Sequence, residues 1–451
     1  MLDKKYFINK DGAVSNEATN YYNNIVAYAK RHDLRNTLAA VDLAAYLHYG
    51  EYRDGGQPYI IHPLEATHYL ILLNVKNPIL AMNSDKLHNK KLAKEATKSE
   101  LDILLASMLL HDTLEDCEKK LPEKGAEFET KYNLHPDVFK FVSILTKHKD
   151  SPGYTLDGYY EQIGNCWQTS IMKIADRVSN CSTIDAFNKK RMEKYVREIV
   201  TYFYPMISKT KNQYPDFSRI LTIMKFLIVS ISESVASVLN LDGIINDDVN
   251  YLKTFFFIKG FAVAKSMSNT LEALPLAESY YKDFKRKSGD AFIIHPLRVC
   301  SYLIALKIDS DNICAAALLH EIIKKCNLPY HGAELIADKH LKPCILDYIR
   351  VMANSENYPL DLYYKTLSQY PEVMLLKLSN RAHTCTTLIN SSDNEIKKYV
   401  DECETYIYPL CEYGIKHNLN ILIVFRLCIT KFVLCVILQE VYGFMISIKS
   451  F

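Results

Sequence analysis

The chain has 451 residues and a mass of 51.9 kDa, a size that suits one to three domains. Apolar residues make up 49% and charged residues 24%, which excludes a disordered or fibrous protein. Lys and Arg number 54 against 52 Asp and Glu, so the formal charge is only +2. Nucleic-acid binding usually needs a larger positive surplus, and we therefore expect no nucleic-acid partner.

The counts of glycine and cysteine predict a helical chain in a reducing compartment. Glycine contributes 14 residues, about 3% against a usual share of about 7%, so tight turns are few and helices are favoured. The twelve cysteines are scattered without a C-x-x-C pair, as in a cytoplasmic protein with free thiols. The N-terminus lacks the apolar core of a signal peptide. The apolar stretch from Ile421 to Leu438 contains Arg426 and Lys431, which favours a buried helix over a membrane span.

Four motifs occur twice along the chain and in the same order. Arg53 stands nine residues before His62-Pro63, and Arg286 stands nine residues before His295-Pro296. The other pairs are Ala106–Asp112 with Ala315–Glu321, Met172–Asn180 with Leu376–Thr384, and Lys194–Pro205 with Lys398–Pro409. The offsets between the copies are 233, 209, 204 and 204, so the copies are collinear. We interpret the chain as a tandem duplication with its join near Leu241–Asn250.

The duplication predicts two domains, one at 1–245 and one at 246–451. The first copy carries 24 extra residues between its His-Pro and His-Asp motifs, which predicts an insertion near 73–98. Five lysines of the insertion are expected on a solvated helix face: Lys86, Lys90, Lys91, Lys94 and Lys98.

Apolar residues recur at helical spacing in both copies, and the stretch Ile103–Leu110 is almost wholly apolar, as in the central helix of a bundle. The predicted fold class is therefore all-α, with two tandem helical bundles that we expect to pack on each other.

A candidate metal site follows from the motifs of the first copy. His62, the pair His111-Asp112, and Asp176 supply imidazole nitrogens and carboxylate oxygens, a donor set that suits a divalent first-row ion. The apolar helix before His111 carries this pair into the interior, where an unpaired charge is unfavourable by several kcal/mol. A bound cation would compensate that charge.

Catalytic and substrate-binding candidates stand beside these residues. Glu115 and Asp116 follow the His-Asp pair by about one helical turn, so we expect them on the same helix face, where they would orient a water and move its proton. Asn180 and Thr183 follow Asp176 at i+4 and i+7 and are expected to face a substrate.

The combined pattern R…H-P, H-D-x-x-E-D and A-D-R-x-x-N-x-x-T resembles the hydrolase domain of RelA/SpoT-type alarmone enzymes, a branch of the HD phosphohydrolases. The resemblance covers most of residues 25–215 and, less completely, 255–440. It implies an all-helical domain that holds Mn²⁺ and removes pyrophosphate from the 3′ position of guanosine tetra- or pentaphosphate (ppGpp, pppGpp).

Carried over residue by residue, the resemblance gives each candidate a role. Arg53 matches an arginine that lies against the guanine base. The implied metal ligands are His62, His111, Asp112 and Asp176, the implied catalytic pair is Glu115 and Asp116, and the implied nucleotide contacts are Asn180 and Thr183.

The two copies depart from the family in opposite ways. The first copy has Asp54-Gly55-Gly56 where the family commonly has Lys-Ser-Gly, so another nucleotide phosphate ester, such as a phosphorylated nicotinamide dinucleotide, stays an alternative substrate. The second copy keeps Arg286-Lys287-Ser288-Gly289 but has Glu321 for the aspartate, Lys324-Lys325 for the catalytic pair and Asn380 for the third-motif aspartate.

Two lysines in place of two carboxylates would repel a divalent cation, so no metal is expected in the second copy. Whether that copy senses a nucleotide or only packs against the first stays open, as does homo-oligomerisation.

Overall fold

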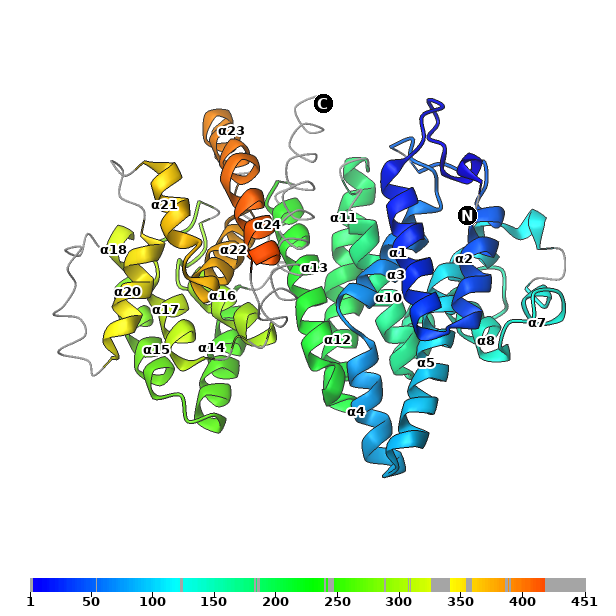
Figure 1. Cartoon of the computed structure of the whole chain (residues 1–451), viewed down its shortest axis with the longest axis horizontal. Helices are drawn as coiled ribbons and strands as arrows, with labels where there is room; N and C mark the ends of the chain where they lie inside the picture. Colours follow the sequence, from blue (N-terminus) through cyan, green and yellow to red (C-terminus); the bar gives the residue numbers. More distant parts are fainter. Residues whose placement is uncertain are drawn as a thin grey trace. The chain divides into compact units, whose positions relative to one another are not determined.

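The computed structural model describes residues 3–417 except 54, 122–124, 182, 183, 185, 186, 239, 240, 242–246, 288, 307, 309, 326–340, 354–358, 386, 387, 389 and 390. Throughout this described part the regular structure is helical, and β-pairing is limited to three isolated bridges (Figure 1). The predicted all-α class is confirmed. The apolar stretch at 421–438 lies outside the described residues, and no described helix is long and apolar enough to cross a bilayer.

Contacts divide the chain into two compact units, Met1–Ile228 and Val229–Phe451. We call these unit 1 and unit 2 and describe each by itself. The dividing point falls within helix α13 (Ser218–Val238), earlier than the predicted boundary at 245/246, which stays a prediction.

Unit 1 is a bundle of helices around the apolar helix α5. Its helices are η1 (Lys4–Phe7), α1 (Asn16–His32), α2 (Arg35–Leu47), α3 (Ile61–Leu72), α4 (Lys76–Leu87), α5 (Lys90–Leu110), α6 (Thr113–Asp116), η2 (Glu118–Lys120), α7 (Glu127–Thr130), α8 (Pro136–Leu145), α9 (Leu156–Ile163), α10 (Trp167–Cys181), α11 (Lys189–Glu198), η4 (Ile199–Phe203), α12 (Tyr204–Gln213), η5 (Pro215–Phe217) and the first part of α13. Residues 101–110 of α5 are all buried, and α5 packs against α2, α3 and α8. Helix α10 packs against α3 and α8, so α3, α5 and α10 surround one interior.

Unit 2 repeats this order of helices. They are α14 (Asp247–Ala264), α15 (Ser268–Tyr281), α16 (Ile294–Ala305), α17 (Asp311–Leu319), α18 (Ile322–Lys325), α20 (Pro343–Met352), α21 (Leu360–Leu367), α22 (Pro371–Cys385), α23 (Asp393–Glu402), η7 (Cys403–Ile407) and α24 (Tyr408–His417). Helices α16, α17 and α22 stand where α3, α5 and α10 stand in unit 1, and they also pack on one another.

One polar contact recurs in both units and joins two helices of each bundle. In unit 1 the carboxylate of Asp102 accepts hydrogen bonds from the backbone N–H groups of Asn36 and Thr37 at the start of α2, at 3.0 and 2.8 Å. In unit 2 Asp311 accepts the same two bonds from Asn269 and Thr270, at 3.0 and 2.7 Å. Each carboxylate thus satisfies backbone donors at a helix start that have no partner within their own helix.

A single π-helical turn also recurs, at Ile199–Phe203 and at Cys403–Ile407. A Tyr-Pro pair follows each turn directly. Proline has no N–H to donate, and its ring clashes with the carbonyl four residues earlier, so a widened turn lets the helix continue into the proline.

The insertion of unit 1 is a helical hairpin made by α4 and the first turns of α5. His88 ends α4 with positive φ, and the Asn89 side chain caps the start of α5. The five lysines of the insertion are exposed, and Lys98 pairs with Asp33.

Candidate metal centre

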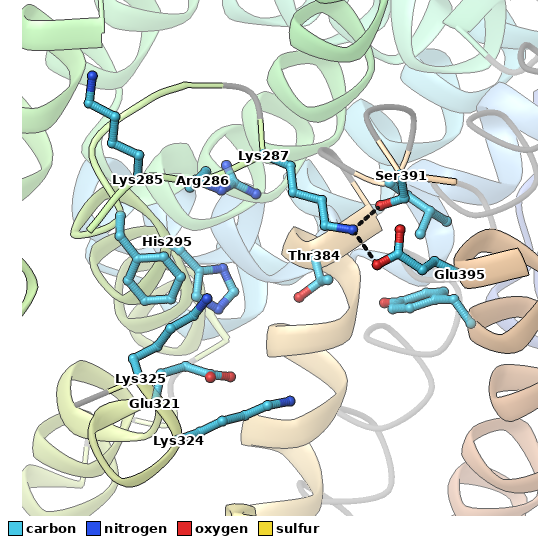
Figure 2. Close-up of a pocket in the computed structure, with 13 residues that line it drawn as sticks. Lys285, Arg286, Lys287, His295, Glu321, Lys324, Lys325, Thr384, Ser391 and Glu395 are labelled. Carbon is cyan, nitrogen blue, oxygen red and sulfur yellow. Dashed lines mark hydrogen bonds and ion pairs between the residues drawn. The ribbon is translucent and has the colours of Figure 1, made fainter. Parts of the chain in front are cut away.

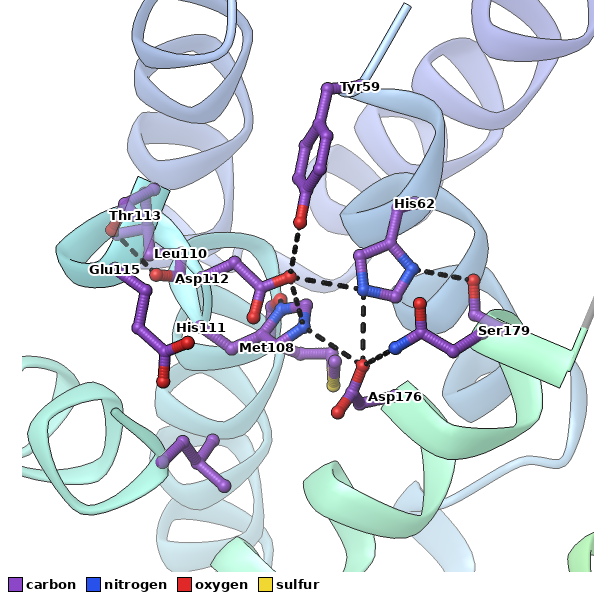
Figure 3. A network of polar contacts seen from close by, with 12 residues as sticks. Tyr59, His62, Met108, Leu110, His111, Asp112, Thr113, Glu115, Asp176 and Ser179 are labelled. Atoms are coloured by element: carbon purple, nitrogen blue, oxygen red, sulfur yellow. Dashed lines mark hydrogen bonds and ion pairs between the residues drawn. The ribbon is translucent and has the colours of Figure 1, made fainter. Parts of the chain in front are cut away.

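Three helices of unit 1 bring four candidate ligands together in the interior (Figure 3). His62 is the second residue of α3, His111 and Asp112 follow the end of α5, and Asp176 lies in α10. One ligand atom from each residue lies within 4.8 Å of the other three. His62 Nε2 lies 3.1 Å from Asp176 Oδ1 and 3.2 Å from Asp112 Oδ2. The structure therefore brings together the four residues that the motifs indicate, while their role as ligands stays a prediction.

The apolar helix ends directly before the His-Asp pair. Thr113 Oγ1 donates a hydrogen bond to the Leu110 carbonyl at 2.6 Å, α5 ends at Leu110, and α6 begins at Thr113 as a separate turn. The single helix that we expected through Glu115 and Asp116 is thus interrupted. The break turns His111 and Asp112 toward α3 and α10.

Hydrogen bonds to the outer nitrogens orient both imidazoles. His111 Nδ1 lies 2.8 Å from the Met108 carbonyl, which can only accept, so Nδ1 carries the proton. His62 Nδ1 lies 2.9 Å from Ser179 Oγ, whose hydroxyl donates to Glu65, so this Nδ1 also donates. Both neutral rings therefore present the lone pair of Nε2 to the centre, the arrangement of metal-binding histidines.

The inner nitrogens of the two imidazoles are left without a hydrogen-bond partner. His62 Nε2 and His111 Nε2 are buried and make no hydrogen bond, although they face two carboxylates. Lone pairs facing carboxylate oxygens repel one another unless a cation lies between them. These residues therefore fit a divalent cation, and nitrogen with oxygen donors suits a first-row metal.

The pKa shifts of His111 and Asp176 agree with a site that fits a divalent cation. Burial disfavours a charged His111, but Asp112 and Asp176 outweigh it and raise the pKa of His111 to about 10. Burial disfavours ionised Asp176, but Lys173 and the two histidines hold its pKa well below the usual value. Without a metal, a proton on His111 balances the carboxylates, and a bound cation would displace that proton.

Lys173 is a member of the site that sequence reasoning missed. Its Nζ lies 2.8 Å from Asp176 Oδ2, and both side chains are buried. Lys173 precedes Asp176 by three residues in α10, so the helical spacing alone was a usable signal. The pair leaves Oδ1 of Asp176 facing the histidines, because Lys173 occupies Oδ2.

The two predicted catalytic carboxylates lie in α6, outside the set of four candidate ligands. Glu115 is exposed and accepts a hydrogen bond from the backbone N–H of Lys147. Asp116 lies at the exposed side of the cluster, where desolvation and the charge of Asp112 raise its pKa. A raised pKa suits a group that takes up a proton near neutral pH.

Arg53 and Asn180, the predicted nucleotide contacts, lie beside the cluster. Arg53 Nη2 donates to Asn180 Oδ1 at 3.2 Å, and Asn180 Nδ2 donates to Asp176 Oδ1. A tight turn presents Arg53, and Gly56 in that turn has φ +81°, which favours glycine. Thr183, the third predicted contact, lies outside the described residues.

Tyr59 is a second residue that the sequence did not reveal. Its hydroxyl donates to Asp112 Oδ2 at 3.0 Å (Figure 3). Its ring stacks on His48. Burial and the charge of Asp112 raise the pKa of Tyr59, so the hydroxyl stays protonated and orients the carboxylate.

We expect Tyr59→Phe to weaken Mn²⁺ binding about 10- to 100-fold, the usual effect of losing an outer-sphere partner. Competition with a fluorescent chelator measures the affinity. Tyr22→Phe is the matched control, because the Tyr22 hydroxyl donates to Asp42, outside the cluster, at 2.7 Å. Equal affinities for the two variants would show that the hydroxyl does not orient a ligand.

Fold and cluster together define a class: an all-helical protein with a buried His/Asp centre for a divalent metal. No family model and no solved structure matches the chain. Curated relatives do match. The chain is 25% identical over 199 residues to a guanosine-3′,5′-bis(diphosphate) 3′-pyrophosphohydrolase of Borreliella burgdorferi, covering 42% of the chain and 26% of the relative.

Two further relatives have names that refer to the same reaction or to the same nucleotide. Identity is 29% over 158 residues to the Aquifex aeolicus protein of the same name, covering 33% of the chain and 22% of the relative. It is 26% over 156 residues to the bifunctional (p)ppGpp synthase/hydrolase SpoT of Escherichia coli, covering 32% of the chain and 22% of the relative. The matches thus span about a quarter of each relative. They show that this part of the chain is similar to RelA/SpoT-type hydrolases, in agreement with the resemblance that the motifs indicate.

Proposed function

We propose that unit 1 hydrolyses ppGpp and pppGpp at the 3′ position, releasing pyrophosphate, with Mn²⁺ as its metal. The convergence of His62, His111, Asp112 and Asp176 is the observation that carries this proposal. The printed names of the relatives support the substrate, because two of the three described above are 3′-pyrophosphohydrolases of guanosine bis(diphosphate).

The four clustered residues would hold the ion, which when bound supplies Lewis-acid polarisation of a phosphoryl oxygen and a more acidic water. Asp116 would accept the proton of the attacking water, because burial and the charge of Asp112 raise its pKa and make it a stronger base than an ordinary aspartate. Glu115 would help to order that water. Arg53 and Asn180, already joined by a hydrogen bond, would contact the nucleotide from the same side.

We propose that unit 2 does not hydrolyse by this route. His295, His320 and Glu321 still lie together, but Asn380 takes the place of Asp176, and Lys324 and Lys325 take the places of Glu115 and Asp116. Burial and neighbouring cations hold the pKa of His295 well below its usual value. The loss of a carboxylate and the added lysines disfavour a divalent cation there.

The proposal includes a small-molecule nucleotide as substrate, a cytoplasmic location, and neither nucleic acid nor membrane as partner. The collinear motifs and the shared order of helices support descent of the two units from one duplicated hydrolase domain.

Metal removal and product analysis test the proposed activity. With Mn²⁺ we expect the purified chain to convert ppGpp to GDP and pyrophosphate, and chelation followed by dialysis should abolish turnover until Mn²⁺ returns. Anion-exchange chromatography separates the products. A panel with GTP and NADPH tests the alternative substrates, and phosphate release from one of these without ppGpp turnover would favour the rival ester. A metal-loaded chain inert toward the whole panel would refute the proposal.

A further inference from the structure

Unit 2 contains a cavity of about 350 Å³ at the position that corresponds to the metal centre of unit 1 (Figure 2). Residues of the turn before α16 and of α16, α18, α22 and α23 form its walls, together with Leu388 and Ser391. Its charged lining residues are Lys285, Arg286, Lys287, Lys324, Lys325, Glu321 and Glu395. Five basic and two acidic residues thus line the cavity, and the surplus of positive charge favours an anion.

The cationic groups approach the cavity from two sides (Figure 2). Arg286 and Lys287 come from the turn, in which Gly289 has φ +94°, as Gly56 has φ +81° in unit 1. Lys324 and Lys325 come from α18, and Lys325 lies over the ring of Phe292 at 4.9 Å. Among the described residues, neither Lys324 nor Lys325 makes an ion pair, so both remain able to bind a ligand anion.

Exchanges around the cavity replace acidic groups of unit 1 with neutral or basic ones. Lys324 and Lys325 replace two carboxylates, Asn380 replaces a third, and Arg298 stands at the position of Glu65. Arg298 is buried, so its charge acts through a medium of low dielectric constant. The site therefore changes from one that attracts a cation to one that attracts an anion.

The histidines of unit 2 fit an anion site that needs no metal. His295 Nδ1 lies 2.7 Å from His383 Nδ1, where unit 1 has the Ser179 hydroxyl. Burial first, and then nearby Arg286 and other cations, hold the pKa of His383 well below its usual value. Neutral imidazoles beside the basic residues of the cavity could form hydrogen bonds to a bound anion without a divalent ion.

The remaining lining indicates the size and kind of ligand. Thr384 and Ser391 offer hydroxyl groups, and Phe292, Leu388 and Tyr399 offer apolar and aromatic surface. Lys287 Nζ contacts Ser391 Oγ at 3.0 Å and Glu395 Oε1 at 2.8 Å, so an incoming phosphate would compete with Glu395 for Lys287. A volume of about 350 Å³ lies within the usual range of small-molecule sites.

We propose that this cavity is a non-hydrolytic, metal-independent binding site for a small molecule that carries a diphosphate group. The cationic residues of the turn and of α18 bind the phosphates from opposite sides, and the aromatic wall accommodates the organic part. The site lies in unit 2, so this proposal and the hydrolytic function of unit 1 can fail independently.

Calorimetry on the full chain tests the site, with GDP and inorganic pyrophosphate as probes and EDTA present throughout. We expect saturable binding of GDP that EDTA does not weaken. The double variant Lys324→Glu/Lys325→Glu should weaken it at least about tenfold, the effect of losing one charged hydrogen bond. Lys90→Glu/Lys91→Glu makes the same charge change on exposed residues of the insertion and should leave affinity within about twofold, as exposed charges act weakly.

A second matched pair tests the turn that lines the cavity. Arg286→Ala should reduce GDP affinity, whereas Lys365→Ala, which removes an exposed cation of unit 2 outside the cavity, should leave it within about twofold. Thermal unfolding verifies that each variant is folded. Absence of binding by the folded wild type in EDTA, binding that requires Mn²⁺, or undiminished affinity in Arg286→Ala would each overturn the proposal.

Discussion

We expect Asp176→Asn to abolish the proposed turnover of ppGpp and to reduce retained Mn²⁺ to the level of the chelated wild type. The substitution gives unit 1 the amide that unit 2 carries at Asn380. Asp176 is the carboxylate toward which His62 and His111 converge, at 3.1 and 3.5 Å, and it is only 4% exposed. An amide keeps the shape but removes the negative charge that a cation needs.

We expect a fall in rate of about 10³-fold or more, since losing several kcal/mol of metal-based stabilisation has an effect of this order. Turnover is measured by anion-exchange chromatography, and retained metal by mass spectrometry after dialysis. Asn380→Asp in unit 2 is the control. It should create no second activity, because Lys324 and Lys325 still stand where unit 1 has Glu115 and Asp116. A wild-type rate in Asp176→Asn would exclude this centre from catalysis.

Lys173→Met and Lys377→Met should change stability in opposite directions, although the two lysines stand at corresponding positions. Lys173 is paired with Asp176 at 2.8 Å. Lys377 is equally buried, lies over the ring of Tyr363 at 5.0 Å, and makes no ion pair with any residue of the described part. Asn380 has replaced the carboxylate that would pair with it.

The reason for the difference is the electrostatic environment. Burial, and then the charge of Arg381, lower the pKa of Lys377 to about 7, although Glu402 and Glu321 act in the other direction. In unit 1 Asp176 outweighs the same desolvation and raises the pKa of Lys173 well above its usual value. Methionine has a similar length and no charge. In unit 2 it removes the cost of burying an ammonium group without an ion pair, and in unit 1 it removes the cation that pairs with Asp176 Oδ2.

We therefore expect Lys377→Met to raise the free energy of unfolding of unit 2. Lys173→Met should lower that of metal-free unit 1 by about 3–5 kcal/mol, the usual effect of breaking a buried ion pair. The unfolded state binds more protons than the folded state between the folded pKa of Lys377, about 7, and its unfolded value near 10.4. The contribution of Lys377 to the free energy of unfolding of unit 2 therefore rises with pH between these two pKa values.

Urea unfolding at pH 6, 8 and 10 measures both effects. The advantage of Lys377→Met should be largest at pH 6 and should decrease toward pH 10, where the lysine is neutral in the folded protein. Lys365→Met, on α21 of the same unit and exposed, is the control and should change stability little. A loss of stability in Lys377→Met at pH 6 would contradict the argument.

Both predictions depend on the same feature. The two helical units are similar, but acidic side chains in the interior of unit 1 correspond to neutral or basic side chains in unit 2. Unit 1 has Asp176 against Lys173, and Glu65 behind Ser179. Unit 2 has Asn380 and Arg298 at the corresponding positions. Under the two proposals, a small set of side chains separates a cation centre from an anion cavity while the order of helices is retained.

The sequence by itself determined the fold class and the four candidate ligands. Helical periodicity and scarce glycine predicted an all-α chain, because both are local properties of the backbone. The repeated motifs indicated His62, His111, Asp112 and Asp176 as one set, and the structure places their ligand atoms within 4.8 Å. The repeat also identified the acidic-to-basic exchange at Lys324 and Lys325 before any geometry was known.

Only the tertiary structure decided which groups touch these residues. Tyr59 carries no motif signal, and although the spacing of Lys173 and Asp176 indicates a shared helix face, it does not show that the pair is buried at the cluster. Their contacts depend on where the turn before α3 and the helix α10 meet α5. The helix break at His111 moves Glu115 to the backbone of Lys147, a contact between residues 32 positions apart. Periodicity assigns a residue to a face of its own helix, whereas helix packing determines which side chain of another helix that face meets.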